Sequence, residues 1–275
     1  MTAEAPLLAF SRRNALLATL ASAPFACRRS GARILTSHDA GGAASPSLSS
    51  QPWGGLTVVR VSSMRDDERG GTAVIVLHGW GAPGDDLVPI AEALKRPGAR
   101  FFVPAAPLPE MGGGRAWWHL DPHTRPPHAA TDRVAPDFRP SPSVVAARAA
   151  VQALIATVVD RYAPETVALL GFSQGAMLSI DVALAGTPAV ARVVAMSGVL
   201  LVDSVPALIA PHAVRPRFLL SHGRQDPVVP FASGTRGKEL LEAHGFPVTW
   251  RPFDGGHEIP APLLAEAERF LFPPG

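Results

Sequence analysis

The chain has little of what would place it in several common classes of protein. It carries one cysteine, Cys27, which excludes an intramolecular disulfide, a four-cysteine zinc site and a cysteine–histidine catalytic pair in a folded domain. Only 17% of its 275 residues are charged and the formal net charge is +2, which gives no basic surface for nucleic acid. Beyond residue 27 no uninterrupted apolar run reaches the about 20 residues of a membrane span. With 47% hydrophobic residues, the sequence predicts one folded domain without a nucleic-acid partner.

Residues 1–27 have the composition of an export signal. Arg12 and Arg13 precede a short apolar stretch and then small residues, an order that resembles a twin-arginine signal. The alternative is an amphipathic surface helix, which the missing polar stripe disfavours. Cys27 lies where bacterial lipoprotein signals place the lipid-acceptor cysteine, but the residues just before it are atypical, so lipidation stays open. We expect an exported bacterial protein, periplasmic or associated with the cell envelope, with a membrane tether if Cys27 is lipidated.

A catalytic domain is predicted to follow a linker. Residues 28–55 include a stretch rich in Ser, Gly, Ala and Pro, which cannot bury enough apolar area to offset the entropy of ordering, so we expect a flexible linker there. The folded domain is then expected over residues 56–275.

Short β-branched runs alternate with helical patterns across this domain. Several runs are continuously apolar, as in residues 73–77 and 167–170, which is typical of parallel strands buried on both faces. The alternation predicts an α/β fold with a mostly parallel, doubly wound sheet flanked by helices. The predicted strands are Leu56–Val61, Thr72–Leu77, Phe101–Pro104, Thr166–Leu170, Arg192–Met196, Arg217–Ser221 and Val248–Pro252, and the predicted helices are 86–95, 143–162, 174–185, 234–244 and 260–271.

The sequence Gly171-Phe172-Ser173-Gln174-Gly175 fits the pattern Gly-x-Ser-x-Gly between a predicted strand and a predicted helix. A sharp strand-to-helix turn holds such a serine in strained backbone geometry, so its neighbours must lack side chains that would collide. The turn also places the serine at a helix N-terminus, which favours the negative charge that develops in acyl transfer. Ser173 is therefore the predicted nucleophile; a turn without chemistry is the alternative.

A serine hydroxyl needs a base and an orienting acid, which follow it in this fold in the order acid, then histidine. Asp226 lies in the loop after one predicted strand and His257 in a glycine-rich loop after the last. We expect Asp226 to be the acid and His257 the base. Asp254 and Glu258 are acidic competitors, but they are too close to His257 in sequence to reach its far nitrogen easily.

The oxyanion of an acyl-transfer intermediate requires backbone N–H donors. The sequence His78-Gly79-Trp80-Gly81 forms a glycine-flanked turn after a predicted strand, which makes the N–H of Trp80 one candidate. The N–H of Gln174, the residue after the nucleophile, is the other. His78 is expected to make a structural hydrogen bond to the backbone, a catalytic role being the alternative.

These motifs together resemble the phospholipase/carboxylesterase family, which includes the acyl-protein thioesterases. The resemblance spans about residues 72 to 271 and implies a serine hydrolase of acyl esters, lysophospholipids or thioesters, without a metal or organic cofactor. In it Ser173, Asp226 and His257 match the family triad, and Trp80 and Gln174 match its oxyanion donors. The motifs that carry it are His78 to Gly81, Gly112 to Trp118, Gly171 to Gly175, Met196 to Gly198, His222 to Pro230 and Gly256 to Ile259.

Two features differ from the compact cytosolic thioesterases of that family. One is the export signal, and the other is an extended loop over residues 108–140, which we expect to cover the acyl pocket. Trp117 and Trp118 in this loop either line an apolar substrate groove or anchor the loop on the core. His119, His123 and His128 are loop histidines rather than metal ligands, because no carboxylate–histidine pattern on a rigid element accompanies them.

We therefore expect a serine esterase that acts on a small-molecule acyl ester through an acyl-enzyme. A peptidase or lactone hydrolase with the same triad is the alternative within the fold. A non-catalytic envelope binding protein is the alternative outside enzymes.

Overall fold

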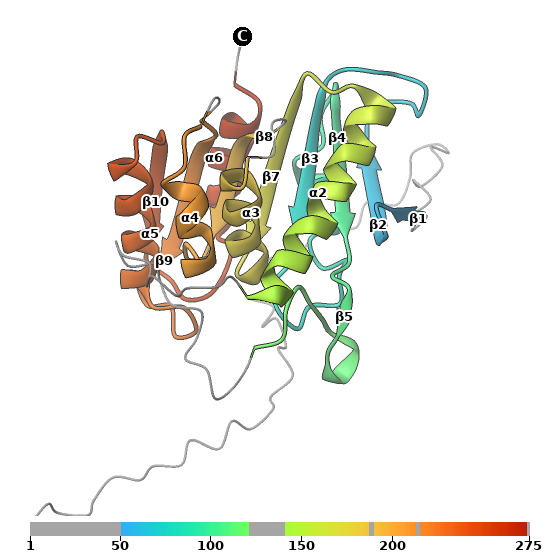
Figure 1. Ribbon diagram of the computed structural model, residues 1–275. Helices are drawn as coiled ribbons and strands as arrows, with labels where there is room; N and C mark the ends of the chain where they lie inside the picture. The colour runs from blue at the N-terminus through green and yellow to red at the C-terminus, as the bar shows by residue number, and fades with distance from the viewer. Residues whose placement is uncertain (1–50, 121–140, 187–189, 213–214, 274–275) are drawn as a thin grey trace, which may run out of the picture. The chain divides into compact units, whose positions relative to one another are not determined.

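The computed structural model describes residues 51–120, 141–186, 190–212 and 215–273. Within them, eight strands form one sheet in the order β1-β2-β4-β3-β7-β8-β9-β10 (Figure 1). Strands β1 and β2 are antiparallel to their neighbours, and all other neighbours from β4 to β10 are parallel. The strands are β1 (Gln51–Trp53), β2 (Leu56–Ser62), β3 (Thr72–Leu77), β4 (Ala99–Pro104), β7 (Thr166–Phe172), β8 (Val190–Met196), β9 (Arg217–Gly223) and β10 (Val248–Phe253).

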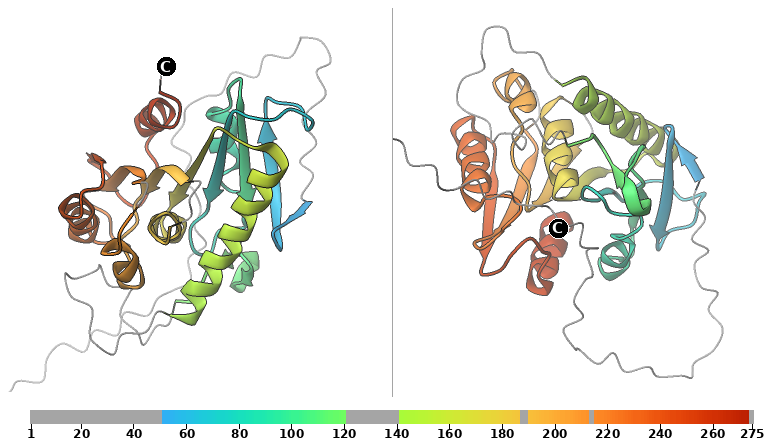
Figure 2. Two further views of the ribbon diagram at one scale, coloured as in Figure 1. Left: turned by 45° about the horizontal axis from the view of Figure 1, so that its top comes forward. Right: turned by 90° about the horizontal axis from the view of Figure 1, so that it is seen from below.

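Helices cover both faces of the sheet (Figure 2). One face carries α2 (Pro142–Tyr162), α3 (Gln174–Leu184), α4 (Val205–Leu208) and α5 (Phe231–Ala243), and the other carries α1 (Val88–Ala93) and α6 (Ala261–Leu271). Successive side chains of a strand point to opposite faces, so Ile75 of β3 lies in the core beneath α2 and α3 while Val74 and Val76 lie in the core beneath α1 and α6. This explains the continuous apolar runs within the central strands.

The seven predicted strands and five predicted helices are all present, with ends that differ by three residues or fewer. Helix α2 is long and apolar enough to cross a membrane, with a mean hydropathy of 1.6, but Val151, Leu154 and Val158 bury one side of it in the core. A two-stranded hairpin of β5 (Leu108–Pro109) and β6 (Arg115–Ala116) surrounds the short 3-10 helix η1 (Met111–Gly113). A second short helix, η2 (Val202–Ser204), precedes α4.

The predicted linker is too long at its C-terminal end. Residues 51–53 form β1, which pairs with β2, and Trp53 is buried, 4% exposed, against the ring of Tyr162 at a centroid distance of 5.9 Å. The fold therefore includes at least residues 51–55 of the predicted linker. The contact between Trp53 and Tyr162, which lies far along the chain, joins this segment to the core. The predicted export signal, the rest of the linker and residues 121–140 of the extended loop lie outside the described residues.

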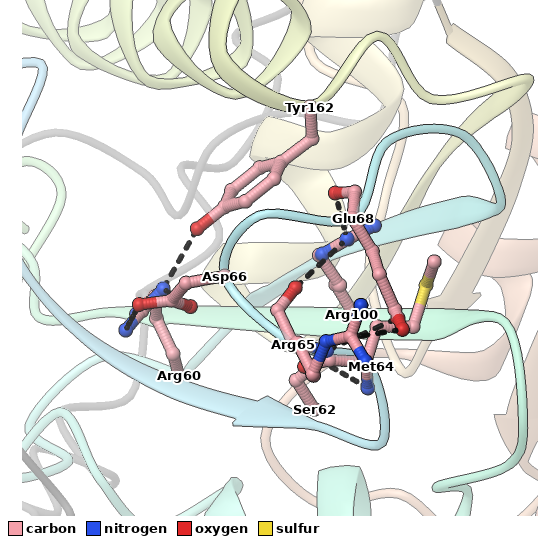
Figure 3. A network of polar contacts seen from close by, with 8 residues as sticks. All are labelled: Arg60, Ser62, Met64, Arg65, Asp66, Glu68, Arg100 and Tyr162. Carbon is pink, nitrogen blue, oxygen red and sulfur yellow. Dashed lines mark hydrogen bonds and ion pairs between the residues drawn. The ribbon is translucent and has the colours of Figure 1, made fainter.

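A polar network fixes the loop between β2 and β3 at the amino ends of the central parallel strands (Figure 3). Arg60 donates to the carboxylate of Asp66 at 2.7 Å and to the hydroxyl of Tyr162 at 2.7 Å. The Arg60 guanidinium holds the pKa of Asp66 below its usual value. Arg100, only 4% exposed, donates to the backbone carbonyls of Gly70, Arg65 and Glu68. The loop is thus held at the amino ends of these strands, and the predicted site lies at their carboxyl ends.

Candidate active site

Ser173 lies at the turn between β7 and α3. Its backbone has φ 54° and ψ −119°, a conformation that residues other than glycine rarely adopt. Its N–H donates to the carbonyl of Met196 at 2.9 Å. A side chain at Gly171 would collide with the backbone of Gly175, and one at Gly175 with the backbone of Leu77. The two glycines of the motif are therefore required by the close approach of β7, α3 and β3.

His257 lies in the loop between β10 and α6, and its ring reaches Ser173. Its Nε2 accepts from the Ser173 hydroxyl at 2.9 Å, and its Nδ1 donates to Oδ2 of Asp226 at 2.8 Å. The donor and acceptor roles follow from the carboxylate, which can only accept. The ring of Phe172 packs on the imidazole at a centroid distance of 4.8 Å. The three residues predicted from the sequence thus form one hydrogen-bonded chain.

Asp226 lies after β9, and its carboxylate is fully buried. Its Oδ1 accepts from the N–H groups of Val228 and Val229, both at 2.8 Å, which leaves Oδ2 for His257. Two backbone donors and the imidazole compensate the burial of this charge, as a buried carboxylate requires. The orientation of Asp226 is therefore fixed by its own loop.

The two acidic competitors of Asp226 point elsewhere. Asp254 is paired with Arg224 at 3.4 Å and its side chain is 84% exposed. Glu258 accepts from the N–H of Gly256 at 3.3 Å. Neither contacts the imidazole of His257, in agreement with the sequence prediction.

Both predicted oxyanion donors lie beside the serine. Gln174 is the first residue of α3, and the turn with Trp80 follows β3, where a Cβ added to Gly79 would lie 3.3 Å from the Cβ of Ser173. Among the described residues, no hydrogen-bond partner occupies the backbone N–H of Trp80 or of Gln174. The Trp80 side chain is 48% exposed and its indole N–H donates to Glu110 at 3.2 Å. Two free donors thus flank the serine at the start of a helix.

Trp117 and Trp118 are core residues. They are 1% and 4% exposed, and the indole N–H of Trp117 donates to the carbonyl of His78 at 3.1 Å. Of the two interpretations that the sequence left open, the structure supports anchoring of the loop, and the assignment of both tryptophans to a substrate groove is not supported. A pair of adjacent tryptophans does not reveal which of the two applies, because burial depends on the elements packed around them.

His78 has the structural role that the sequence favoured. Its ring is fully buried, its Nε2 accepts from the N–H of Ala106 at 3.0 Å, and its Nδ1 donates to the carbonyl of Gly79 at 2.7 Å. Burial lowers the pKa of this imidazole and keeps it neutral. It therefore supports the turn that carries Trp80 and is not a base.

His222 supports the site, a role that the motif from His222 to Pro230 did not reveal. It is 1% exposed, and its Nε2 donates to the carbonyl of Val229 at 2.9 Å and lies 3.4 Å from Oδ2 of Asp226. Gly234 of α5 packs on its ring so closely that a Cβ there would collide with the imidazole. In the sequence, only the spacing of four residues between His222 and Asp226 could have indicated that this histidine supports the loop of the acid.

Nothing in the described part of the chain resembles a metal centre. No group of three or more His, Cys, Asp or Glu side chains there could hold an ion. His119 binds Glu110 at 2.8 Å, while His123 and His128 lie outside the described residues.

A serine at a strand-to-helix turn, bonded through a histidine to a buried aspartate at the carboxyl ends of a parallel sheet, defines a serine hydrolase of the α/β-hydrolase fold. The chain belongs to the phospholipase/carboxylesterase family, whose model matches residues 58–272. It is accordingly a carboxylic-ester hydrolase, as the sequence predicted.

Known proteins support this assignment. The chain is 33% identical over 112 residues to acyl-protein thioesterase 1 of Gibberella zeae, a match that covers 39% of this chain and 48%, about half, of that protein. It is 29% identical over 208 residues to a probable carboxylesterase of Oryza sativa subsp. japonica, which covers 72% of this chain and 76% of that protein. Among solved structures, esterase PE8 aligns with a TM-score of 0.66 at 25% identity, over 78% of this chain and 97% of the esterase.

Proposed function

We propose that Ser173, His257 and Asp226 hydrolyse carboxylic esters through an acyl-enzyme. The observation that carries the proposal is the hydrogen-bonded chain from the Ser173 hydroxyl to Asp226, with distances of 2.9 and 2.8 Å. In the first step the Ser173 oxygen attacks the ester carbonyl while His257 takes the hydroxyl proton, and the alcohol leaves with that proton. Water then attacks the acyl-serine, His257 again moves the proton, and the carboxylic acid is released.

Each supporting group has a defined part in this cycle. Asp226 keeps the hydrogen of the imidazole on Nδ1, so that Nε2 faces the serine with a free lone pair, and it stabilises the imidazolium that forms. The N–H groups of Trp80 and Gln174 stabilise the oxyanion of the two tetrahedral intermediates.

Active-site labelling tests the nucleophile. A fluorophosphonate probe is expected to label the wild-type protein and the matched control Ser143→Ala, which changes an exposed serine of α2. Ser173→Ala is expected to abolish the label and ester turnover while the melting temperature stays near that of wild type. Equal labelling of Ser173→Ala and wild type would refute the assignment.

The substrates that we propose are short- to medium-chain acyl esters, with lysophospholipids and thioesters as the further members of the same class. The support comes from the family and from the names of relatives, which include a probable carboxylesterase and acyl-protein thioesterases. A kinetic profile on p-nitrophenyl esters from acetate to palmitate, with thioester, amide and lactone counterparts, measures the preference. A higher kcat/KM on amides or lactones than on every ester would replace the proposal by the peptidase or lactone-hydrolase alternative.

We also propose that the protein is exported across a bacterial membrane. The support is the sequence alone: Arg12 and Arg13 before a short apolar stretch, small residues, and Cys27 as a candidate lipid acceptor. Cell fractionation is expected to find the wild-type protein in the envelope or periplasm and the Arg12→Lys/Arg13→Lys variant in the cytoplasm. Mass spectrometry of the mature N-terminus determines whether Cys27 carries lipid, which would tether the enzyme to a membrane.

A further inference from the structure

The side chain of Gln174 makes a pair of buried hydrogen bonds that the proposed mechanism does not use. Gln174 is 2% exposed, its Oε1 accepts from the N–H of Trp117 at 2.9 Å, and its Nε2 donates to the carbonyl of Trp118 at 2.7 Å. A primary amide has an oxygen that accepts and a nitrogen that donates side by side. It can therefore bond a backbone N–H and a backbone carbonyl of another segment, as a neighbouring strand does. The start of α3 is thereby fixed to residues 117–118.

Residues 114–118, which we call the β6 segment, also hold the other half of the oxyanion site. The N–H of Arg115 donates to the carbonyl of Ala82 at 2.8 Å, and the N–H of Gly81 donates to the carbonyl of Arg115 at 2.9 Å. The indole of Trp117 donates to the carbonyl of His78 at 3.1 Å. A Cβ on Gly114 would collide with the backbone of Gly81, so the two chains touch. The turn that carries Trp80 is therefore bonded to the β6 segment on both sides of that residue.

The two proposed oxyanion donors come from different elements, and the β6 segment joins them. The Trp80 N–H belongs to the turn after β3, and the Gln174 N–H belongs to the start of α3. Oxyanion stabilisation requires both donors within about 3 Å of one oxygen, a geometry that a displacement of about 0.5 Å degrades. The connection from one donor to the other runs through the Gln174 side chain, the β6 segment and the turn.

We propose that the Gln174 side chain is a positioning residue for the oxyanion hole: it sets the spacing of the Trp80 and Gln174 N–H donors by joining α3 to the β6 segment. This inference rests on the proposed function, because it concerns the donors of that mechanism. The side chain makes its two hydrogen bonds to the β6 segment, and the backbone N–H of residue 174 is retained in every variant.

The variant Gln174→Met tests the proposal. Methionine has nearly the volume of glutamine and fills the same buried space, but it cannot make the two hydrogen bonds. We expect kcat to fall about ten- to a hundredfold, less than the loss of a donor outright, with KM changed less than about threefold. The matched control is Gln152→Met, which makes the same chemical change on α2, and it is expected to keep wild-type kinetics.

Two further measurements separate positioning of the oxyanion hole from general damage. An alkyl trifluoromethyl ketone adds to the serine and places an oxyanion in the hole, so its affinity should fall in parallel with kcat in Gln174→Met. The shape of the kcat/KM pH profile should stay that of wild type, because the variant leaves the catalytic triad unchanged. If Gln174→Met does not fold, Gln174→Asn keeps both amide groups one methylene short, and the same losses are expected.

Failure of the positioning role of Gln174 and failure of the proposed esterase activity give different results. A folded Gln174 variant with kcat within twofold of wild type, or with undiminished affinity for the ketone, overturns the positioning role. So does a loss of kcat accompanied by an altered pH profile, which would place the damage in the triad. A wild-type protein that neither reacts with fluorophosphonate nor turns over any ester overturns the proposed function itself.

Discussion

Arg148 of α2, which is partly buried, pairs with the buried Asp181 of α3, and replacing the arginine alone is expected to destabilise the fold strongly. Arg148 donates to the two carboxylate oxygens at 2.7 and 3.2 Å, and the carboxylate is fully buried. In Arg148→Met, the carboxylate loses both of these bonds and keeps the one from the hydroxyl of Ser204 at 2.8 Å. Leaving one charge of a buried pair without its partner costs about 3–5 kcal/mol. In a domain of this size the melting temperature should fall by roughly 10 °C.

The loss should depend on pH in a defined direction. Burial raises the pKa of Asp181, and the hydrogen bonds from Arg148 oppose that rise. Without Arg148 the pKa of Asp181 in the folded protein rises further. Asp181 then binds a proton in the folded protein at pH values where it is ionised in the unfolded chain. Stability then decreases as the pH increases from the unfolded pKa of about 3.8 through the folded pKa. The deficit of Arg148→Met relative to wild type should therefore be larger at pH 8 than at pH 5.

Urea unfolding followed by circular dichroism at both pH values measures this deficit. Lys238→Met, which removes one partner of a partly exposed pair with Glu242 on α5, is the control and should cost less than about 1 kcal/mol. The double variant Arg148→Met/Asp181→Asn should recover much of the loss and its pH dependence. A deficit under about 1 kcal/mol, or one that is equal at pH 5 and pH 8, would show that an unpaired buried charge is not the cause.

Three further outcomes are expected. Asp226→Asn should lower kcat about 10³- to 10⁴-fold in an ester assay at unchanged stability, because an amide cannot hold the correct tautomer of the base; a loss below tenfold contradicts this. His222→Phe and Gly234→Ala should each lower kcat roughly tenfold with little change in KM, because both release the loop of the acid; wild-type kcat in a folded His222→Phe would rule out that support. His78 has a lowered pKa, so the wild-type protein should lose stability as the pH falls below 6.5, and His78→Gln should reduce that slope in unfolding experiments; an unchanged slope would count against the neutral His78.

The fold and the triad could be predicted from the sequence because both leave local marks. Buried parallel strands are continuously apolar, and the turn of Ser173 needs glycines where its neighbours approach. The acid and the base could be chosen because they follow strands in the required order, and their own loops orient them.

The residues that the sequence did not reveal are those whose partners lie far along the chain. Arg148 meets Asp181 across two helices, Gln174 meets Trp117, which lies 57 residues earlier in the chain, and Trp53 meets Tyr162 at the sheet edge. Which side chains meet in this way depends on the packing of whole elements, and no periodicity within either element encodes it. The burial of Trp117 and Trp118 has the same origin, so the choice between groove and anchor needed the structure.

Strand β8 contributes no member of the triad, yet its end is bonded to Ser173 and to β9, the strand that precedes Asp226. The carbonyl of Met196 holds the N–H of Ser173, and the N–H of Ser197 donates to the carbonyl of Ser221 at 2.8 Å, one residue before His222. Main-chain atoms at the end of β8 therefore tie the nucleophile to β9, the strand that leads to the acid, while the buried side chains of β8 pack into both layers of the core. Because this link uses main-chain atoms alone, it does not depend on which side chains occupy the loops that follow the strands.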